Sequence, residues 1–198
     1  MPYEYRTMTP EERAAVVAYR RSKGYPLHSP PHPYREGGWY IITAANYEHN
    51  PILQPAERRT AFEDQLLITL NAIGEVGAWV ILPNHYHVLT MVESLDVLSA
   101  ALKQLHGTTA RTWNLEDALT GQRRVWYKFY DRWVRNEAHY YRALNYIHYN
   151  AVKHRYAETP YDWPWSSVTR YVEAFDREWL RVQWKAYPPP TSDFGDVP

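Results

Sequence analysis

The sequence lacks three features that would define its class at once. It contains no cysteine, which excludes disulfide bonds, zinc–thiolate centres and cysteine nucleophiles. It has no apolar run long enough to cross a bilayer and no apolar segment of the signal-peptide kind at its N-terminus. It has no net charge, since 22 Lys and Arg balance 22 Asp and Glu. We therefore expect a soluble cytoplasmic protein without a membrane segment, in which 198 residues form one domain with extensions.

The zero net charge conceals a basic segment. Between Lys103 and Arg155, ten Lys and Arg accompany four Asp and Glu, which leaves an excess of six positive charges. Contacts with a phosphate backbone need a local excess of this kind. Aromatic residues alternate with basic ones over 123–130, and such a stretch can stack on unpaired bases. The same pattern also fits ordinary strand and core residues, so composition alone does not decide between the two interpretations.

The order of the predicted elements is that of a ferredoxin-like fold. Strands are predicted over 39–44, 76–82, 85–92 and 125–134 from their β-branched and aromatic residues. Helices are predicted over 55–73, 95–114 and 137–153 from apolar residues at helical spacing, with Ser94 and Asn136 as N-caps. The first six elements form a βαββαβ unit, which predicts an α+β fold with a four-stranded antiparallel sheet; the helix over 137–153 is additional.

Both ends of the chain are predicted to extend beyond this unit. Thr9-Pro10-Glu11-Glu12 has the composition of a capping box, so a helix is expected from there to about Lys23. Four prolines between 25 and 33 predict a linker. We therefore divide the chain into an N-terminal extension (1–35), a central domain (36–172) and a C-terminal extension (173–198), which packs over the core or frays.

His85-Tyr86-His87 is the first candidate site. Side chains alternate along a strand, so both imidazoles lie on one face, together with Leu89 and Met91, at the rim of an apolar row. Two histidines at this spacing are close enough to hold one metal ion. With nine histidines in the chain, two partly buried and hydrogen-bonded rings explain the spacing equally well.

The helix predicted over 137–153 is the second candidate site. At about 100° per residue, its polar side chains fall on one face, opposite a core face. Tyr146 and Asn150 are one turn apart on the polar face and can point at one spot. An ordinary amphipathic helix with a solvated tyrosine is the alternative. The polar face comprises His139, Arg142, Tyr146, Tyr149, Asn150 and Lys153, and the core face Tyr140, Tyr141, Leu144, Ile147 and Ala151.

Several segments together resemble a known family. Residues 79–89 look like the His-hydrophobic-His signature of the single-tyrosine HUH transposases, and 146–154 are similar to the helix motif of the REP-associated tyrosine transposases. Residues 103–107, 126–131 and 162–167 also match in order, so the resemblance spans about 39–171. The chain departs from the family where Ala151 replaces the usual proline and Tyr86 stands between the histidines, and the first 35 residues have no clear counterpart.

The resemblance implies a site and a reaction. His85, His87 and Asn150 would bind a divalent metal, for which the family precedent is Mg²⁺ or Mn²⁺, although imidazole ligands suit manganese and later transition metals better than magnesium. Tyr146 would be the nucleophile that forms a covalent 5′-phosphotyrosine intermediate. The substrate would be single-stranded or hairpin DNA such as a repetitive extragenic palindrome.

The resemblance also assigns work to the basic segment. Arg142 and Lys153 are candidates for promoting loss of the tyrosine proton, and we expect a monomer. Contacts to the DNA backbone are predicted for Lys103, Arg111, Arg123, Arg124, Lys128, Arg142 and Lys153.

Two other functions remain open at this stage. One is a non-catalytic module that binds single-stranded nucleic acid on its sheet by aromatic stacking. The other is a metal-dependent hydrolase that uses water and leaves Tyr146 without a role. The presence of both histidines, the asparagine and the tyrosine favours the transposase-like enzyme.

Overall fold

The computed structural model describes residues 9–12, 14–15, 18 and 37–189. At the N-terminus it confirms the capping box: the Thr9 backbone N–H donates to Glu12 Oε2 at 2.7 Å, and the Glu12 N–H donates to Thr9 Oγ1 at 3.2 Å. The predicted helix end near Lys23 and the linker over 25–33 lie outside the described residues. Glu36–Asp196 forms a compact unit of its own, which is described below by itself.

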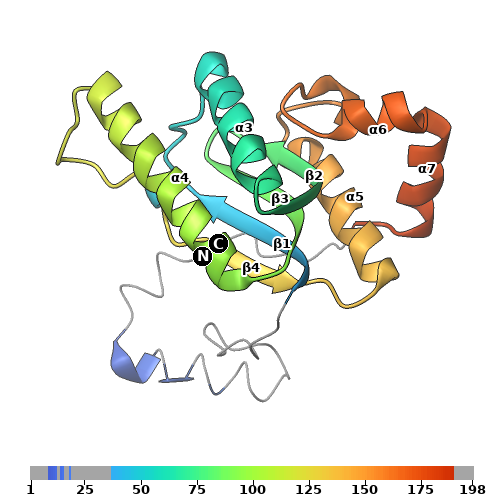
Figure 1. The fold of residues 1–198 in the computed structure, drawn as a ribbon, viewed down its shortest axis with the longest axis horizontal. Coiled ribbons are helices and arrows are strands. Elements are labelled where there is room, and N and C mark those ends of the chain that lie inside the picture. The colour runs from blue at the N-terminus through green and yellow to red at the C-terminus, as the bar shows by residue number, and fades with distance from the viewer. Residues whose placement is uncertain (1–8, 13, 16–17, 19–36, 190–198) are drawn as a thin grey trace. The chain divides into compact units, whose positions relative to one another are not determined.

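A four-stranded sheet is the centre of this unit. Its strands are β1 (Gly38–Ala45), β2 (Gly74–Ile81), β3 (His85–Val92) and β4 (Tyr130–Trp133). They pair in the order β2-β3-β1-β4, and every pair is antiparallel (Figure 1). This is the order of a ferredoxin-like βαββαβ unit, so the predicted α+β fold is confirmed.

Helices cover both faces of the sheet. Figure 1 shows α3 (Ala56–Asn71) and α4 (Leu95–Glu116) on one side and α5 (Glu137–Lys153) on the other. Two N-caps act as predicted: the side chain of Ser94 accepts from the Val97 N–H, and that of Asn136 accepts from the His139 N–H at 2.9 Å. None of the described helices is long and apolar enough to span a membrane.

The alternation of β3 separates two cores. One core, against α3 and α4, contains Tyr86, Val88 and Val92 from this strand. The other core, against α5, contains Leu89, and its remaining members come mainly from the facing strands and from the helix. The helix contributes Ala143, Leu144, Tyr146, Ile147 and Ala151 to this second core.

The last strand is shorter than predicted. Only Tyr130–Trp133 pairs with β1, whereas the prediction began the strand at Val125. The Trp126 ring instead turns into the core under α4 and donates from Nε1 to Thr109 Oγ1 at 3.0 Å. Trp126 still forms an isolated antiparallel bridge with Asn46, and the Tyr127 N–H donates to the Ala45 carbonyl at 2.9 Å, so regular pairing is interrupted only between these residues and β4.

Gly74, the residue after the helix predicted over 55–73, begins β2. A Cβ atom at this position would lie 1.9 Å from the Met91 carbonyl oxygen on β3, so only glycine fits there. The helix before it ends at Asn71. The same glycine therefore marks both the turn and a close approach of two backbones.

The C-terminal segments close the edge of the sheet. After α5 come η2 (Pro160–Asp162), α6 (Val168–Ala174) and α7 (Arg177–Ala186), and a short η1 (Tyr47–His49) follows β1. The Trp165 carbonyl accepts from the Ile81 N–H at 2.9 Å, and Trp163 Nε1 donates to the Ile81 carbonyl at 2.9 Å. These bonds cover the free edge of β2, which would otherwise expose unpaired backbone groups.

Candidate active site

His85 and His87 lie at the start of β3, on the face that α5 covers. Their ring centroids are 5.1 Å apart, and they share this face as predicted. They are more deeply placed than the predicted rim position, with exposed fractions of 7% and 0%. The reason is that side chains from the last turns of α5 cover this end of the strand.

Hydrogen bonds fix the tautomer of His85. The Asn84 amide donates from Nδ2 to the His49 carbonyl at 3.3 Å, which turns Asn84 Oδ1 toward His85 Nδ1, 2.8 Å away. An amide oxygen only accepts, so Nδ1 carries the proton. The His85 Nε2 atom lies 3.3 Å from Asn150 Oδ1. If the ring is neutral with its proton on Nδ1, Nε2 has a lone pair and both atoms can face one cation.

His87 is held in a similar way from the neighbouring strand. Its Nδ1 atom lies 2.7 Å from the hydroxyl oxygen of Thr43, the residue paired with it on β1. When that hydroxyl accepts, the lone pair of the His87 ring is on Nε2, a buried atom. Both imidazoles are thus oriented through Nδ1, in the manner of partners that orient metal-binding histidines.

Tyr146 and Asn150 meet this pair from α5. The Tyr146 ring centroid is 5.1 Å from that of His87, with the rings nearly perpendicular. The polar face predicted for this helix is therefore not solvated here, since Tyr146 is 2% exposed and Asn150 is fully buried. The one-turn spacing does bring both side chains to one spot, as predicted.

The end of α5 adds a residue that sequence reasoning missed. The Tyr156 N–H bonds to the Ala151 carbonyl at 2.9 Å and Arg155 has a positive φ of 61°, which is a Schellman ending. His154 is the C-cap of this helix, and its ring centroid is 4.9 Å from that of His85. The signal was its position one turn beyond Asn150 on the same side of the helix.

Cations also reach the tyrosine, and one differs from the prediction. Lys153 Nζ lies 5.0 Å from the centre of the Tyr146 ring. Arg132 of β4 interacts electrostatically with Tyr146, while burial and the nearby Arg135 lower the pKa of its guanidinium. Arg142, predicted for this role, is exposed and acts on His139. Arg132 was missed because a single arginine on a short strand carries no pattern.

The residues predicted to contact DNA fall into two groups. Lys103 and Arg111 are exposed on α4, and Lys128, Arg142 and Lys153 are also exposed. The other two have partners within the fold. Arg123 bonds to Asp117 at 2.8 Å, and Arg124 donates to the Trp126 carbonyl at 3.0 Å. These two cations therefore hold the loop after α4 in place.

The site has the donor chemistry of a metal centre. Two imidazole nitrogens and an amide oxygen come together, each oriented by burial or by a hydrogen bond. The Asn150 Nδ2 atom is buried without a hydrogen-bond partner among the described residues, an arrangement that lowers stability. The described residues hold no cluster of three or more His, Cys, Asp and Glu suited to a metal, and the Asn150 amide oxygen would be the third donor beside the two imidazoles.

The segment 162–167 has a structural role here. Its Ser167 backbone N–H donates to the Trp79 carbonyl at 3.0 Å, and its hydroxyl lies 3.0 Å from Nε2 of the buried His148. Burial lowers the pKa of His148 to about 3, so this ring is neutral. The motif therefore fixes α5 against the edge of β2 and positions the catalytic candidates indirectly.

Comparisons with known proteins agree with the motifs. No family model matches the chain. It is 30% identical over 100 residues to the REP-associated tyrosine transposase of Escherichia coli (strain K12), a match that covers 50% of this chain and 56% of that protein. It is 29% identical over 116 residues to a putative REP-associated tyrosine transposase of Haemophilus influenzae, covering 53% of this chain and 66% of that protein. The matches thus span little more than half of the first relative.

A solved structure shows the same fold. It is described as a REP-associated tyrosine transposase bound to a REP hairpin, and it superposes with a TM-score of 0.63 at 21% identity. The superposition covers 85% of this chain and 96% of the other. The superposition shows a shared fold, and the two sequence matches show that this chain is similar to REP-associated tyrosine transposases.

Proposed function

We propose that this protein is a metal-dependent endonuclease and strand transferase for single-stranded DNA, acting on hairpins or repetitive palindromes. The observation that carries the proposal is the convergence of His85 and His87 on β3 with Tyr146 and Asn150 on α5. The relatives are named as tyrosine transposases, and the solved neighbour is bound to a REP hairpin, which supports this substrate class.

His85, His87 and Asn150 would hold the metal, which we expect to be Mg²⁺ or Mn²⁺. A bound divalent cation polarises a non-bridging phosphate oxygen and stabilises the charge that develops there. Asn84 and Thr43 keep the two imidazoles oriented toward that position. The ring of His154 packs on His85 and restricts its rotation, so it acts as a positioning residue.

Tyr146 would be the nucleophile. Its hydroxyl oxygen forms a bond to phosphorus while the bond from phosphorus to the 3′ oxygen breaks. The hydroxyl gives up its proton, and the leaving 3′ oxygen gains one. The fragment on the 3′ side of the cut stays attached to Tyr146 through its 5′-phosphate. Because one phosphate ester replaces another, attack by a 3′-hydroxyl rejoins strands without a nucleotide cofactor.

Cations around the tyrosine favour this chemistry. Arg132 and Lys153 stabilise a negatively charged phenolate oxygen and the phosphate that approaches it. We expect the exposed Lys103, Arg111 and Lys128 to contact the DNA backbone. All the site residues come from one chain, in which β3 and α5 are already in contact, and we therefore expect the monomer to be competent.

Labelled hairpin DNA tests the proposal. The protein is incubated with a DNA hairpin labelled at its 5′ or 3′ end and Mn²⁺, and the products are separated on denaturing gels. We expect an adduct that retains the 3′ label and disappears in Tyr146→Phe. Tyr141→Phe is the matched control, because it removes the same hydroxyl from another position on α5, where the ring stacks on Tyr187.

Other outcomes identify the alternative functions. Cleavage without an adduct indicates a hydrolase that uses water. Binding without cleavage indicates a non-catalytic nucleic-acid-binding module. An adduct that persists in Tyr146→Phe and vanishes in Tyr149→Phe shows that the nucleophile is assigned to the wrong turn of α5.

A further inference from the structure

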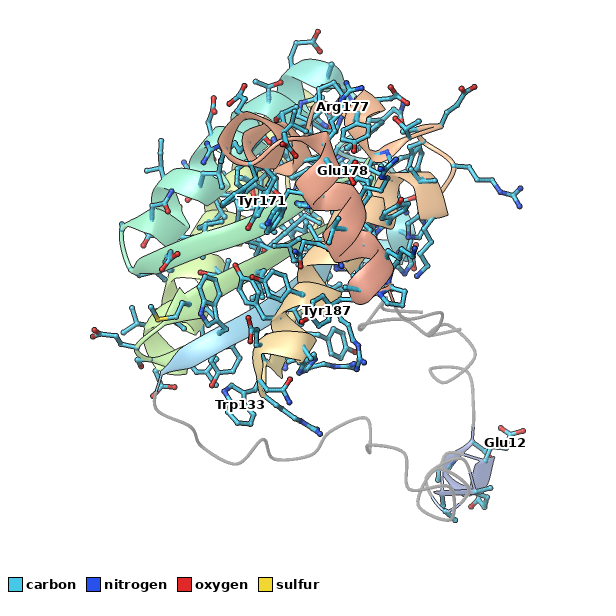
Figure 2. All side chains as sticks on the ribbon, turned by 90° about the vertical axis from the view of Figure 1, so that its right-hand side faces the viewer. Glu12, Trp133, Tyr171, Arg177, Glu178 and Tyr187 are labelled. Atoms are coloured by element: carbon cyan, nitrogen blue, oxygen red, sulfur yellow. The ribbon has the colours of Figure 1, made fainter. Side chains whose placement is uncertain are left out.

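A hollow lies beside α5, at the position of Tyr149. It has a volume of about 300 Å³, at the lower end of the range for ligand clefts. Its walls come from α5, η2 and α7, and Figure 2 shows Arg177 and Glu178 at the end of α7 far from Tyr187. The lining residues are Tyr149, Tyr161, Arg177, Glu178, Arg181 and Trp184.

Three aromatic rings form one side of this pocket. The Trp184 ring centroid is 4.7 Å from that of Tyr149 and 5.6 Å from that of Tyr161. Burial raises the pKa of both tyrosines, so their hydroxyls stay neutral and can donate hydrogen bonds. Flat apolar rings with hydroxyl groups at their edges suit a ligand that is itself flat and polar at its edge.

The other side of the pocket is positively charged. The Arg177 guanidinium lies 4.5 Å from the centre of the Tyr161 ring. Arg181 forms an ion pair with Glu178, three residues before it, and both side chains are largely exposed. Two arginines with one glutamate leave an excess of one positive charge, which matches a ligand carrying one phosphate.

The position of the pocket relates it to Tyr146. Tyr149 follows Tyr146 by three residues on α5, which is a rise of about 4.5 Å and a rotation of about 60°. A DNA strand advances about 3.4 Å per nucleotide in a duplex. A strand with its phosphate at Tyr146 therefore reaches the pocket within a few nucleotides.

We propose that this pocket binds one unpaired nucleotide of the substrate strand close to the cut. The base would lie on the rings of Tyr161 and Trp184, and its phosphate would contact Arg177 and Arg181. The inference rests on the proposed function and adds a place where the strand is recognised. Stacking tolerates any base, whereas the tyrosine hydroxyls read its edge.

Abasic substitution tests this inference by binding alone. The protein carries Tyr146→Phe, and EDTA is present, so no cleavage occurs. The probe is a fluorescent DNA hairpin with a single-stranded flank on each side, in which one nucleotide at a time is made abasic. We expect one flank position to weaken binding about 5- to 150-fold, the loss that corresponds to one stacked base.

The decisive comparison adds Tyr161→Ala. If the pocket holds that base, the abasic probe and the intact probe bind this variant equally, because the stacking partner is already gone. Phe175→Ala is the matched control, since it removes an exposed ring that does not line the pocket, and it should keep the full abasic effect. Equal abasic effects with and without Tyr161→Ala overturn the inference.

A second variant covers the case in which Tyr161→Ala does not fold. A plot of the logarithm of the binding constant against the logarithm of the salt concentration has a slope that depends on the number of phosphate contacts. Arg177→Gln should reduce the magnitude of this slope by about one, the value for one lost contact. An unchanged slope contradicts the phosphate assignment. Adduct formation by the wild-type protein is measured in parallel. If the adduct forms but the abasic effect is the same with and without Tyr161→Ala, only the pocket assignment is wrong. If the protein binds no hairpin at all, the proposed function itself is wrong.

Discussion

Two buried histidine–tyrosine pairs lie on opposite faces of the same sheet. On the face covered by α3 and α4, the Tyr86 hydroxyl is 2.9 Å from His106 Nε2. On the face covered by α5, the His87 ring is 5.1 Å from the Tyr146 ring. Both tyrosines are nearly inaccessible, with exposed fractions of 0% and 2%. By residue type and burial alone, the two pairs are equivalent.

Their neighbours make the difference. The His106 ring stacks on Trp126 at 4.5 Å, and burial raises the pKa of Tyr86 and lowers that of His106 to about 4. Both side chains are therefore held neutral and bond to each other. The pair near α5 has a second imidazole, an amide oxygen and two cations beside it. Convergence of donors and charges, more than burial, distinguishes a candidate site from a polar core.

Removing the ring from each pair gives the largest contrast. We expect His87→Ala to abolish Mn²⁺-dependent adduct formation, because a ligand is lost. His106→Gln should retain the adduct and lower the free energy of unfolding by about 1–3 kcal/mol, because a buried hydrogen bond is disturbed. Gel assays and urea denaturation measure the two effects. Loss of the adduct in the folded His106→Gln protein would contradict the claim that only the pair near α5 takes part in the reaction.

Acid should act through the pair on the α3 and α4 face, in addition to His148, whose pKa burial also lowers. The pKa of His106 falls from 6.5 in the unfolded chain to about 4 in the folded protein. Between these values the unfolded chain binds a proton that the folded protein excludes, so stability falls as the pH drops from about 6.5 to about 4. The contribution is at most about 3 kcal/mol. As the pH falls through this range, the urea midpoint of His106→Gln should drop less steeply than that of the wild type. Equal slopes in the two proteins would show that the His106 ring is not the cause.

Loosening the partners of the two histidines proposed to bind metal should have an intermediate effect. Asn84→Ala leaves His85 Nδ1 without its acceptor, and Thr43→Val does the same for His87. Each is expected to weaken Mn²⁺ binding about 10- to 100-fold, the usual cost of removing such a partner. Calorimetric titration with Mn²⁺ alone measures this without any DNA. Wild-type affinity in both variants would argue against a metal at this pair.

The smallest effect is expected at the cation beside Tyr146. Lys153→Gln removes a charge that lies 5.0 Å from the ring centre and should slow adduct formation about 2- to 5-fold. Lys185→Gln on α7 is a suitable control for the loss of one lysine. Initial rates under single-turnover conditions separate the two variants. An equal decrease in both would assign the effect to overall charge.

Much of the fold could be predicted because its signals are local. β3 and α5 have the predicted bounds, since alternating apolar residues and the Asn136 cap depend only on nearby residues. β4 was predicted too long, because the interruption between the Asn46–Trp126 bridge and Tyr130 has no local signal in the sequence. The edge pairing of 163–167 with β2 was missed for the same reason.

In the site, too, the local features could be predicted from the sequence and the long-range contacts could not. His85, His87, Tyr146 and Asn150 were predicted from strand and helix periodicity and from the family motifs. Their burial was not, because it depends on how α5 packs on the sheet. Arg132 was missed because its approach to Tyr146 is a long-range contact between β4 and the helix.

The central claim is that the Tyr146 oxygen forms the bond to DNA, and peptide mapping tests it most directly. The adduct is formed with hairpin DNA and Mn²⁺, digested with nuclease and protease, and fragmented by tandem mass spectrometry. We predict that the remaining 5′-phosphonucleotide is attached at Tyr146. Attachment at Tyr149 or any other residue, or an intact hairpin with no modified peptide, would contradict the claim.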